Sequence, residues 1–136
     1  MSSAVSVEVY SGQKPLSTAP AVAPFNREAY LARVDGDAAF ARELIDLFLS
    51  ESPEIMVTIS RAIQTGDATA LRLAAHTMRG TAANFSAQPT QDIAHRLEHL
   101  GRTGEFSGTQ ELYVTLVEVV TRLRSALIAL SADLAS

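Results

Sequence analysis

The sequence contains no cysteine, which excludes disulfide bridges and thiolate metal sites. It has no apolar run approaching the ~20 residues of a membrane-spanning helix, so we expect no membrane contact by this segment. The net charge is -4, and the basic stripe that nucleic-acid binding requires is missing. A basic stretch followed by an apolar block is also missing from residues 1–10, so no secretion signal is predicted and a cytoplasmic location is expected.

Apolar residues make up 47% of the 136 residues, enough for one domain with a real core. Residues 1–24 differ from the rest, because they hold three of the five prolines among many serines, alanines and threonines. We interpret them as a flexible N-terminal linker or tail. The alternating valines of residues 5–9 only weakly support a short strand. Residues 25–136 are predicted to form the folded domain.

Helix start signals recur from residue 25 onward. Asn26, Asp37 and Asp67 are each predicted to cap the N-terminus of a helix. Ser107 and Gln110 have the spacing of a capping box before the last helix.

Apolar residues repeat at intervals of three and four in the segments between these signals. Ser52-Pro53 predicts either a new helix start or a kink within a longer helix. The predicted core positions outside the helix of His76 are Phe40, Leu44, Leu47, Phe48, Met56, Ile59, Ile63, Ile93, Leu97, Leu100, Leu112, Leu116, Val119, Leu123, Ala126 and Leu130. The predicted fold class is therefore all-α, an antiparallel four-helix bundle with one or two additional short N-terminal helices.

One histidine, His76, lies away from the core stripe of its helix. On a wheel of ~100° per residue, that stripe is predicted to be Leu71, Ala75, Met78, Ala82 and Phe85. His76 is therefore expected to be exposed, with Arg72 and Arg79 in reach. Leu73 falls on the same outer side.

Two neighbours suggest a function for His76. Arg79 follows it by three residues and Gly80 by four, so both lie beside it on the helix surface. A glycine there costs roughly 1 kcal/mol of helix stability against alanine, but it leaves the imidazole uncovered. An uncovered ring beside a fixed positive charge suits the uptake of an anionic group, so His76 is predicted to accept a phosphoryl group. Leu73, Gly80 and Ala83 together predict a flat patch that docks another protein.

The run from Ala75 to Phe85 resembles the signature of histidine-containing phosphotransfer (HPt) domains, roughly A-H-x-L-K-G-S-A-x-x-L-G-A. Arg79 stands where the family most often has lysine, which keeps the charge but changes its shape. Ser86 stands where the family usually has glycine, so the helix end must depend on Ser86 capping the next segment or on Pro89. The similarity extends over about residues 25 to 132 and includes Phe25-Asn26-Arg27, Gly36-Asp37, Leu47-Phe48-Leu49, Pro53-Glu54, Gly66-Asp67 and Leu97-Glu98.

The resemblance implies that Nε2 of His76 takes a phosphoryl group from an aspartyl phosphate on a response-regulator receiver domain and passes it to another receiver. Arg79 would balance the phosphate charge, with Arg72 as a weaker second candidate. Gly80 would allow the receiver to approach. Glu98 would orient the ring through Nδ1.

The resemblance also implies what this chain does not supply. It would be a carrier and not an enzyme, since no glycine-rich phosphate loop provides a nucleotide site. No cofactor or metal is expected on this chain, and Mg²⁺ is expected on the receiver partner. The chain is either free-standing or the cytosolic part of a larger, membrane-anchored hybrid sensor histidine kinase.

Other interpretations of the histidines remain. His95 and His99 lie four residues apart, a spacing that can bind zinc, but no third ligand is evident, and two partly exposed histidines near a helix C-terminus fit better. Glu98 is either the partner of His76 or one of many solvated helix acids. Alternatively, the chain is a helical interaction or dimerisation module in which His76 is not phosphorylated.

Overall fold

The structure is a computed structural model that describes residues 22–136. The weakly supported strand at residues 5–9 lies outside the described residues, as does nearly all of the predicted tail. The described part contains five helices and no strand. The helices are α1 (Arg27–Arg33), α2 (Ala38–Thr65), α3 (Ala68–Ala83), α4 (Gln88–Thr103) and α5 (Thr109–Ala135).

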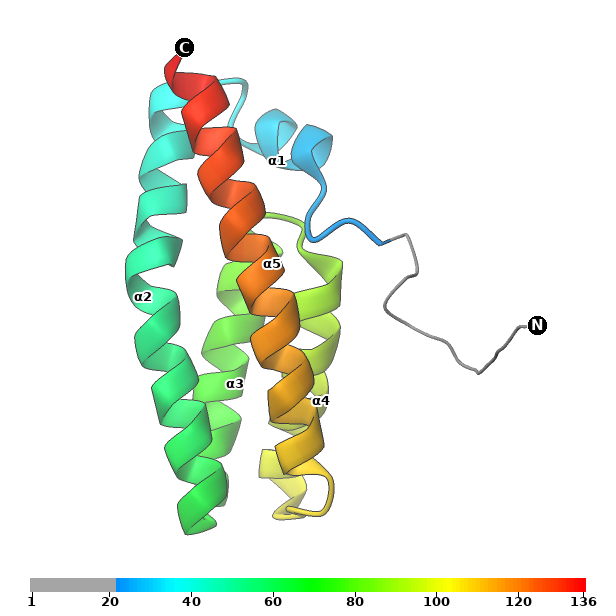
Figure 1. The fold of residues 1–136 in the computed structure, drawn as a ribbon. Helices are drawn as coiled ribbons and strands as arrows, with labels where there is room; N and C mark the ends of the chain where they lie inside the picture. Colours follow the sequence, from blue (N-terminus) through cyan, green and yellow to red (C-terminus); the bar gives the residue numbers. More distant parts are fainter. Residues whose placement is uncertain (1–21) are drawn as a thin grey trace, which may run out of the picture.

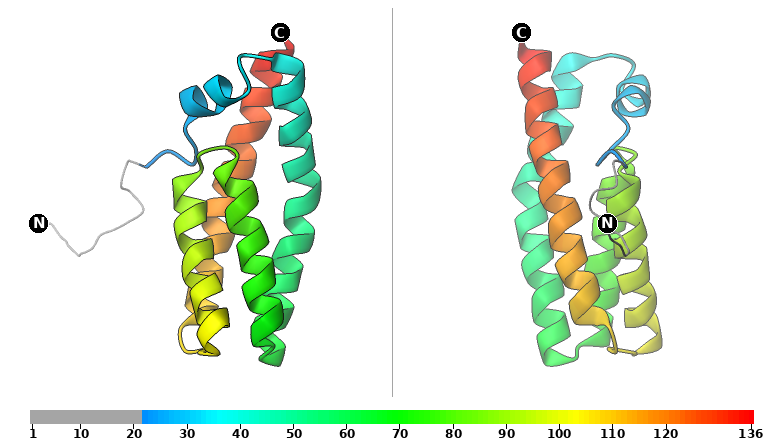
Figure 2. Two further views of the ribbon diagram at one scale, coloured as in Figure 1. Left: turned by 180° about the vertical axis from the view of Figure 1, so that it is seen from behind. Right: turned by 45° about the vertical axis from the view of Figure 1, so that its right-hand side comes forward.

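Four of these helices form an antiparallel bundle (Figure 1). α2, α3, α4 and α5 run alternately in opposite directions, each packs against the next, and α2 also packs against α5, which closes the ring. α2 and α5 extend beyond the α3–α4 pair at one end, and α1 lies over that end of the pair (Figure 2). The all-α prediction is confirmed, with one additional N-terminal helix.

Three predicted caps are confirmed. The side chains of Asn26, Asp37 and Asp67 each accept a hydrogen bond from the backbone N–H three residues later, at 2.9–3.0 Å. The predicted capping box before α5 is wrong. Gly108 occupies the cap position without a side-chain cap bond, at a φ of +82° that glycine adopts without strain.

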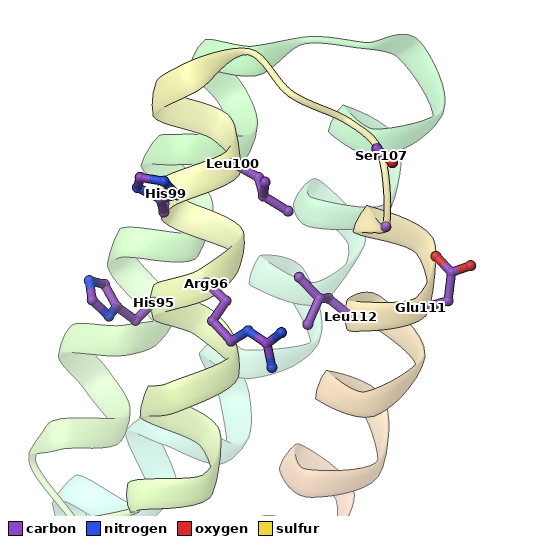
Figure 3. Close-up of a pocket in the computed structure, with 8 residues that line it drawn as sticks. His95, Arg96, His99, Leu100, Ser107, Glu111 and Leu112 are labelled. Atoms are coloured by element: carbon purple, nitrogen blue, oxygen red, sulfur yellow. The ribbon is translucent and has the colours of Figure 1, made fainter.

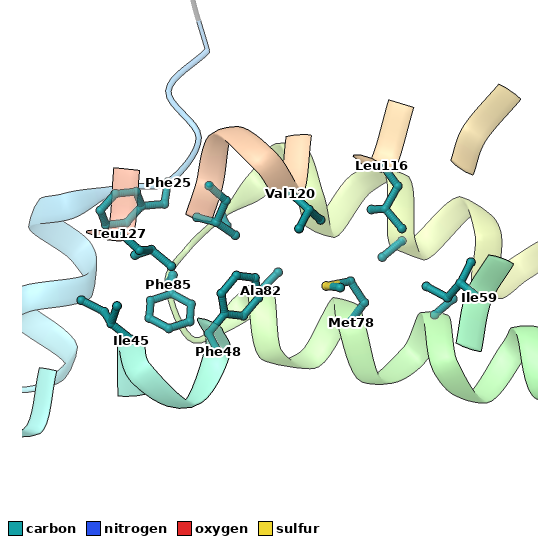
Figure 4. Packing of buried hydrophobic residues seen from close by; sticks show 14 of the residues in the cluster. Phe25, Ile45, Phe48, Ile59, Met78, Ala82, Phe85, Leu116, Val120 and Leu127 are labelled. Atoms are coloured by element: carbon teal, nitrogen blue, oxygen red, sulfur yellow. The ribbon is translucent and has the colours of Figure 1, made fainter. Parts of the chain in front are cut away.

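The core runs the length of the bundle and includes a cluster of aromatic rings beside α1 (Figure 4). There Phe25, Tyr30, Phe48 and Phe85 pack ring against ring, with centroids 4.8–6.4 Å apart. Burial raises the pKa of Tyr30 to about 12, so its neutral hydroxyl donates to the Ala41 carbonyl at 2.6 Å. These rings hold the N-terminal helix on the end of α3.

Two residues of α2 that were predicted in the core are exposed. Phe40 is 45% exposed and Leu47 is 51% exposed, whereas their neighbours Ala41 and Phe48 are buried. Each residue precedes a buried one and is rotated from it by ~100° about the helix axis, so the buried stripe is narrower than predicted. All five predicted core residues of α3 (68–83) and the turn after it are buried, and the predicted positions of α4 and α5 are buried or packed against the core, except Leu100, which is half-buried and lines a hollow between α4 and α5.

α2 continues through Pro53 without a new start. Proline has no N–H, so the carbonyl of Leu49 loses its helical donor. Arg124 of α5 replaces that donor: its Nη1 lies 2.8 Å from the Leu49 oxygen and 2.6 Å from the hydroxyl of the buried Ser52. The gap that proline opens in α2 is thus closed from the neighbouring helix.

We expect Arg124→Met to lower the free energy of unfolding by about 2 kcal/mol, because the carbonyl of the half-buried Leu49 and the hydroxyl of the buried Ser52 lose their charged donor. Pro53→Ala returns an N–H donor to the Leu49 carbonyl. Arg124→Met should therefore cost less stability in the Pro53→Ala variant than in the parent protein. Denaturant unfolding of the single and double variants measures the coupling, with Arg122→Met, at an exposed arginine of the same helix, as control. Equal losses in both backgrounds would contradict this account.

The helix α3 ends because the backbone of Ser86 leaves the helical conformation. Ser86 has a φ of +53°, and the next N–H, that of Ala87, bonds the Ala82 carbonyl at 3.1 Å, as at many helix ends that carry glycine. Of the two alternatives expected for this helix end, a Ser86 cap on the next segment is wrong, because Ala87 is the N-cap of α4 and has no side-chain cap bond. Pro89, the other alternative, occupies the first turn of α4. Serine therefore holds a conformation that suits glycine.

Ser86→Gly should stabilise the fold by roughly 0.5–1 kcal/mol, because glycine adopts the left-handed conformation without the steric cost that a Cβ adds. Thermal unfolding at neutral pH measures the change. Destabilisation would show instead that the serine side chain stabilises this turn.

Candidate functional site

His76 lies in the middle of α3 with its side chain 61% exposed. The residues on either side of it in the sequence, Ala75 and Thr77, are buried and exposed respectively, so the ring stands at the border between core and solvent. Nδ1 points to α4, where it lies 2.9 Å from Oε2 of Glu98. No hydrogen bond to the other ring nitrogen, Nε2, comes from residues 22–136.

Glu98 is a buried carboxylate, only 3% exposed, and three side chains contact it. Arg79 holds it with two groups: Nε lies 2.6 Å from Oε1, and Nη2 lies 3.3 Å from Oε2. Arg102 places its own Nη2 3.2 Å from Oε2, the oxygen that His76 also contacts. A carboxylate that is removed from water needs such partners to remain charged.

The surroundings of Glu98 keep it ionised. The hydrogen bond from Arg79 lowers the pKa of Glu98 to about 2, aided by the bond from His76 and opposed by burial. The same hydrogen bond raises the pKa of Arg79 above its ordinary value. Near neutral pH the site therefore contains a carboxylate, which accepts hydrogen bonds only.

This charge state assigns the proton on the His76 ring. Nδ1 has two near neighbours, Oε2 of Glu98 at 2.9 Å and Nη2 of Arg79 at 3.2 Å. A carboxylate cannot donate, so Nδ1 carries the proton and donates to Glu98, and the Arg79 contact is not a hydrogen bond to that nitrogen. The lone pair of the neutral ring is then on Nε2.

The low pKa of Glu98 predicts a pH dependence of stability. Its folded pKa of about 2 is below the ordinary value of 4.5, so the charged carboxylate contributes its full stability above pH 4.5 and loses it as the pH falls toward 2. We expect Glu98→Gln to be less stable than the parent near neutral pH, with a difference that shrinks across this range. Unfolding free energies of both proteins at several pH values test this, and a constant difference would contradict it.

The prediction missed Gly101, which sets the distance between α3 and α4. A Cβ built on it lies 2.6 Å from the backbone nitrogen of Arg72 and 2.9 Å from its Cα, closer than real contacts allow. Only glycine permits the two backbones to approach this closely at the end of the bundle nearest Arg72. A glycine inside an amphipathic helix was the available signal.

The prediction also missed Arg102, although its signal is in the sequence. Arg102 follows Glu98 by four residues on α4, the spacing at which an acid and a base meet on a helix surface. Its side chain is 54% exposed. Arg79 and Glu98 were both predicted near His76, and the structure places them there.

The remaining predicted site residues surround His76 without bonding to it. Gly80 is exposed, and a Cβ built on it meets nothing within 4 Å. Leu73 is 52% exposed, while Ala83 is half-buried and its carbonyl accepts a hydrogen bond from Arg33 of α1 at 2.7 Å. Arg72 is half-buried, and the ion pairs of Glu98 are with Arg79 and Arg102 instead.

The other two histidines of the sequence lie elsewhere on α4. Figure 3 shows His95 and His99 projecting from one side of the helix, while Arg96 extends on the side that faces α5. With Leu112 of α5 they line a hollow of about 540 Å³. Among residues 22–136, no group of three or more histidine, aspartate and glutamate side chains is arranged to hold a metal ion.

Within the same described range, none of the helices has both the length and the apolar character needed to span a bilayer.

Comparison with models of protein families shows the family of this chain. The model described as "Hpt domain" matches residues 43–132, a range that includes His76, Arg79 and Glu98. The chain belongs to the Hpt domain family. Hpt domains act as histidine-phosphotransfer carriers with receiver domains in phosphorelays, and this general role applies to the present chain.

Two solved Hpt structures share its fold. Histidine-containing phosphotransfer protein B from Pseudomonas aeruginosa PAO1 is 22% identical with a TM-score of 0.77, over 83% of this chain and 98% of that one. The HPT domain of a sensor hybrid histidine kinase from Shewanella is 18% identical with a TM-score of 0.72, over 83% of this chain and 97% of that one. No curated protein matches the sequence significantly.

Proposed function

We propose that this Hpt domain is a phosphorelay intermediate in which His76 takes a phosphoryl group from an aspartyl phosphate on one receiver domain and gives it to another. The observation that carries the proposal is the orientation of His76: Nδ1 is 2.9 Å from a buried carboxylate, and the side chain is 61% exposed. This arrangement presents Nε2, with its lone pair, to an approaching protein.

In the transfer step, Nε2 attacks the phosphorus of the aspartyl phosphate. A nitrogen–phosphorus bond forms, and the bond between phosphorus and the aspartyl oxygen breaks, so the receiver carboxylate leaves with the electron pair. Such transfers depend on in-line positioning and on stabilisation of charge. We expect Mg²⁺ on the receiver to supply part of that stabilisation, with none bound by this chain.

Glu98 serves this step in two ways. Before attack, its contact with Nδ1 keeps the proton on that nitrogen and the lone pair on Nε2. During attack the ring gains positive charge while Nδ1 keeps its proton, and a carboxylate at 2.9 Å stabilises this imidazolium, as the aspartate of a catalytic triad does. Arg79 faces the phosphoryl group as a counter-charge, and Arg72 adds weaker support from one turn earlier.

The surface around His76 supports docking of a receiver. Gly80 leaves an open approach one turn after the histidine. Leu73, one turn before it, is half-exposed and borders a hollow of about 430 Å³ between α2 and α3 that also includes Ile55 and Thr77. With Ala83, Leu73 and Gly80 form a surface of apolar and small residues, and Glu54 is the charged residue that lines the hollow beside it.

The test is phosphoryl transfer from labelled receiver domains of the same genome. We expect label to move to this chain as an acid-labile, base-stable phosphoramidate and then to a second receiver. Failure of every receiver to transfer label, or an acid-stable product, would refute the proposal. Gel filtration of the same protein would show whether it is instead a dimerisation module.

A further inference from the structure

Arg79 has two competing duties in this site. It is the cation that faces a phosphoryl group on His76, but in the unphosphorylated protein its Nε and Nη2 donors are engaged by Glu98, at 2.6 and 3.3 Å. A guanidinium that makes two hydrogen bonds to one carboxylate is held in a fixed position and orientation by them. That pair of hydrogen bonds lies on the Nδ1 side of the His76 ring, whereas the phosphoryl group would be on Nε2, so pairing with it draws Arg79 away from Glu98, at least in part.

Leaving Glu98 alone would be costly. The carboxylate is 3% exposed, and a buried charge that loses its partner is strongly destabilised. Among residues 22–136, Oε1 accepts a hydrogen bond from Arg79 alone. Oε2, in contrast, is also held by His76 and by Arg102. One positive charge thus remains beside Glu98 after Arg79 turns away.

We propose that Arg102 is a positioning residue that holds the Glu98 carboxylate while Arg79 turns from Glu98 to the phosphoryl group on His76. Two features of the geometry favour this division of labour. Arg79 is 38% exposed, and its Nη2 already lies 3.2 Å from the His76 ring. Arg102 comes from α4, the helix of Glu98 itself, and reaches its oxygen from a solvent-facing position. The proposal rests on His76 being the phosphoryl acceptor.

The test uses phosphoramidate, a small phosphoryl donor that needs no receiver, together with nuclear magnetic resonance of the Arg79 Nε–H group. In the parent protein this resonance should move when His76 is phosphorylated, because its hydrogen bond to Glu98 is lost. In Arg102→Gln it should stay in place, and the phosphorylated fraction at equilibrium should fall roughly tenfold, the equivalent of one hydrogen bond to a charged group.

Two control variants separate positioning from structure. Arg102→Lys keeps the charge and should restore both the resonance shift and the phosphorylated fraction. Arg96→Gln removes an exposed arginine of the same helix that is not bonded to Glu98, and should behave like the parent. An Arg79 resonance that moves in Arg102→Gln as in the parent, or that does not move in the parent, would overturn the proposal. Failure of the receiver relay is seen separately, as absent transfer from a receiver while phosphoramidate still labels His76.

Discussion

His76→Gln will abolish receiver-dependent, acid-labile phosphorylation of this chain while leaving the fold in place. The substitution removes the nucleophilic Nε2, and within residues 22–136 the remaining hydrogen bonds to Glu98 come from arginines and not from a second imidazole. The side chain is 61% exposed, and Glu98 keeps both arginines. We therefore expect the free energy of unfolding to change by no more than about 1 kcal/mol.

The matched controls for this loss are His95→Gln and His99→Gln. Both histidines lie on α4 and are exposed, so they too are accessible to chemical labelling. Both variants should accept phosphoryl groups from a receiver at the parent rate. Phosphohistidine retained by His76→Gln, or lost by either control variant, would contradict the assignment of the acceptor.

Gly80→Glu will block transfer from a receiver without reducing helicity. The new side chain meets nothing within 4 Å in the free protein, and glutamate is the better helix former by roughly 0.5–1 kcal/mol. It stands one turn from His76, where it brings bulk and a negative charge against an anionic phosphoryl donor. A like charge placed across an interface costs several kcal/mol, so transfer should slow by about 100-fold or more.

Three comparisons divide this effect into its causes. Gly80→Ala adds only a methyl group and should reduce the rate least, and Gly80→Gln adds the bulk without the charge. Phosphoramidate is small enough to pass the new side chain, so it should still label His76 in Gly80→Glu. A parent-like rate of transfer from the receiver to Gly80→Glu would mean that close approach at this glycine is not required.

The bundle and the histidine face were predictable because both depend on local periodicity. Each predicted core residue of α3 and the turn after it, from Leu71 to Phe85, is buried, and His76 and Leu73 are exposed as their angular positions require. Asp67 begins the helix where its short polar side chain can bond the backbone. Such features follow from residues a few positions apart, which sequence spacing determines directly.

Features that depend on contact between helices were harder to predict. Arg124 contacts the carbonyl of Leu49, which Pro53 leaves without its helical donor. The two bonded residues are 75 positions apart in the sequence, and nothing near either of them indicates the contact. The left-handed turn at Ser86 has no local signal either, because serine does not favour it. Glu98 was named as a partner of His76 only by resemblance to a family, since its burial depends on how α4 sits against α3.

The most direct measurement is the position of the phosphorus in the phosphorylated protein, determined from nitrogen–phosphorus couplings of the histidine rings. With phosphoryl groups delivered by a receiver, we predict one coupled nitrogen, Nε2 of His76, while Nδ1 of the same ring still carries its proton. Phosphorus on Nδ1, or on His95 or His99 in place of His76, would contradict the orientation that Glu98 gives to the ring.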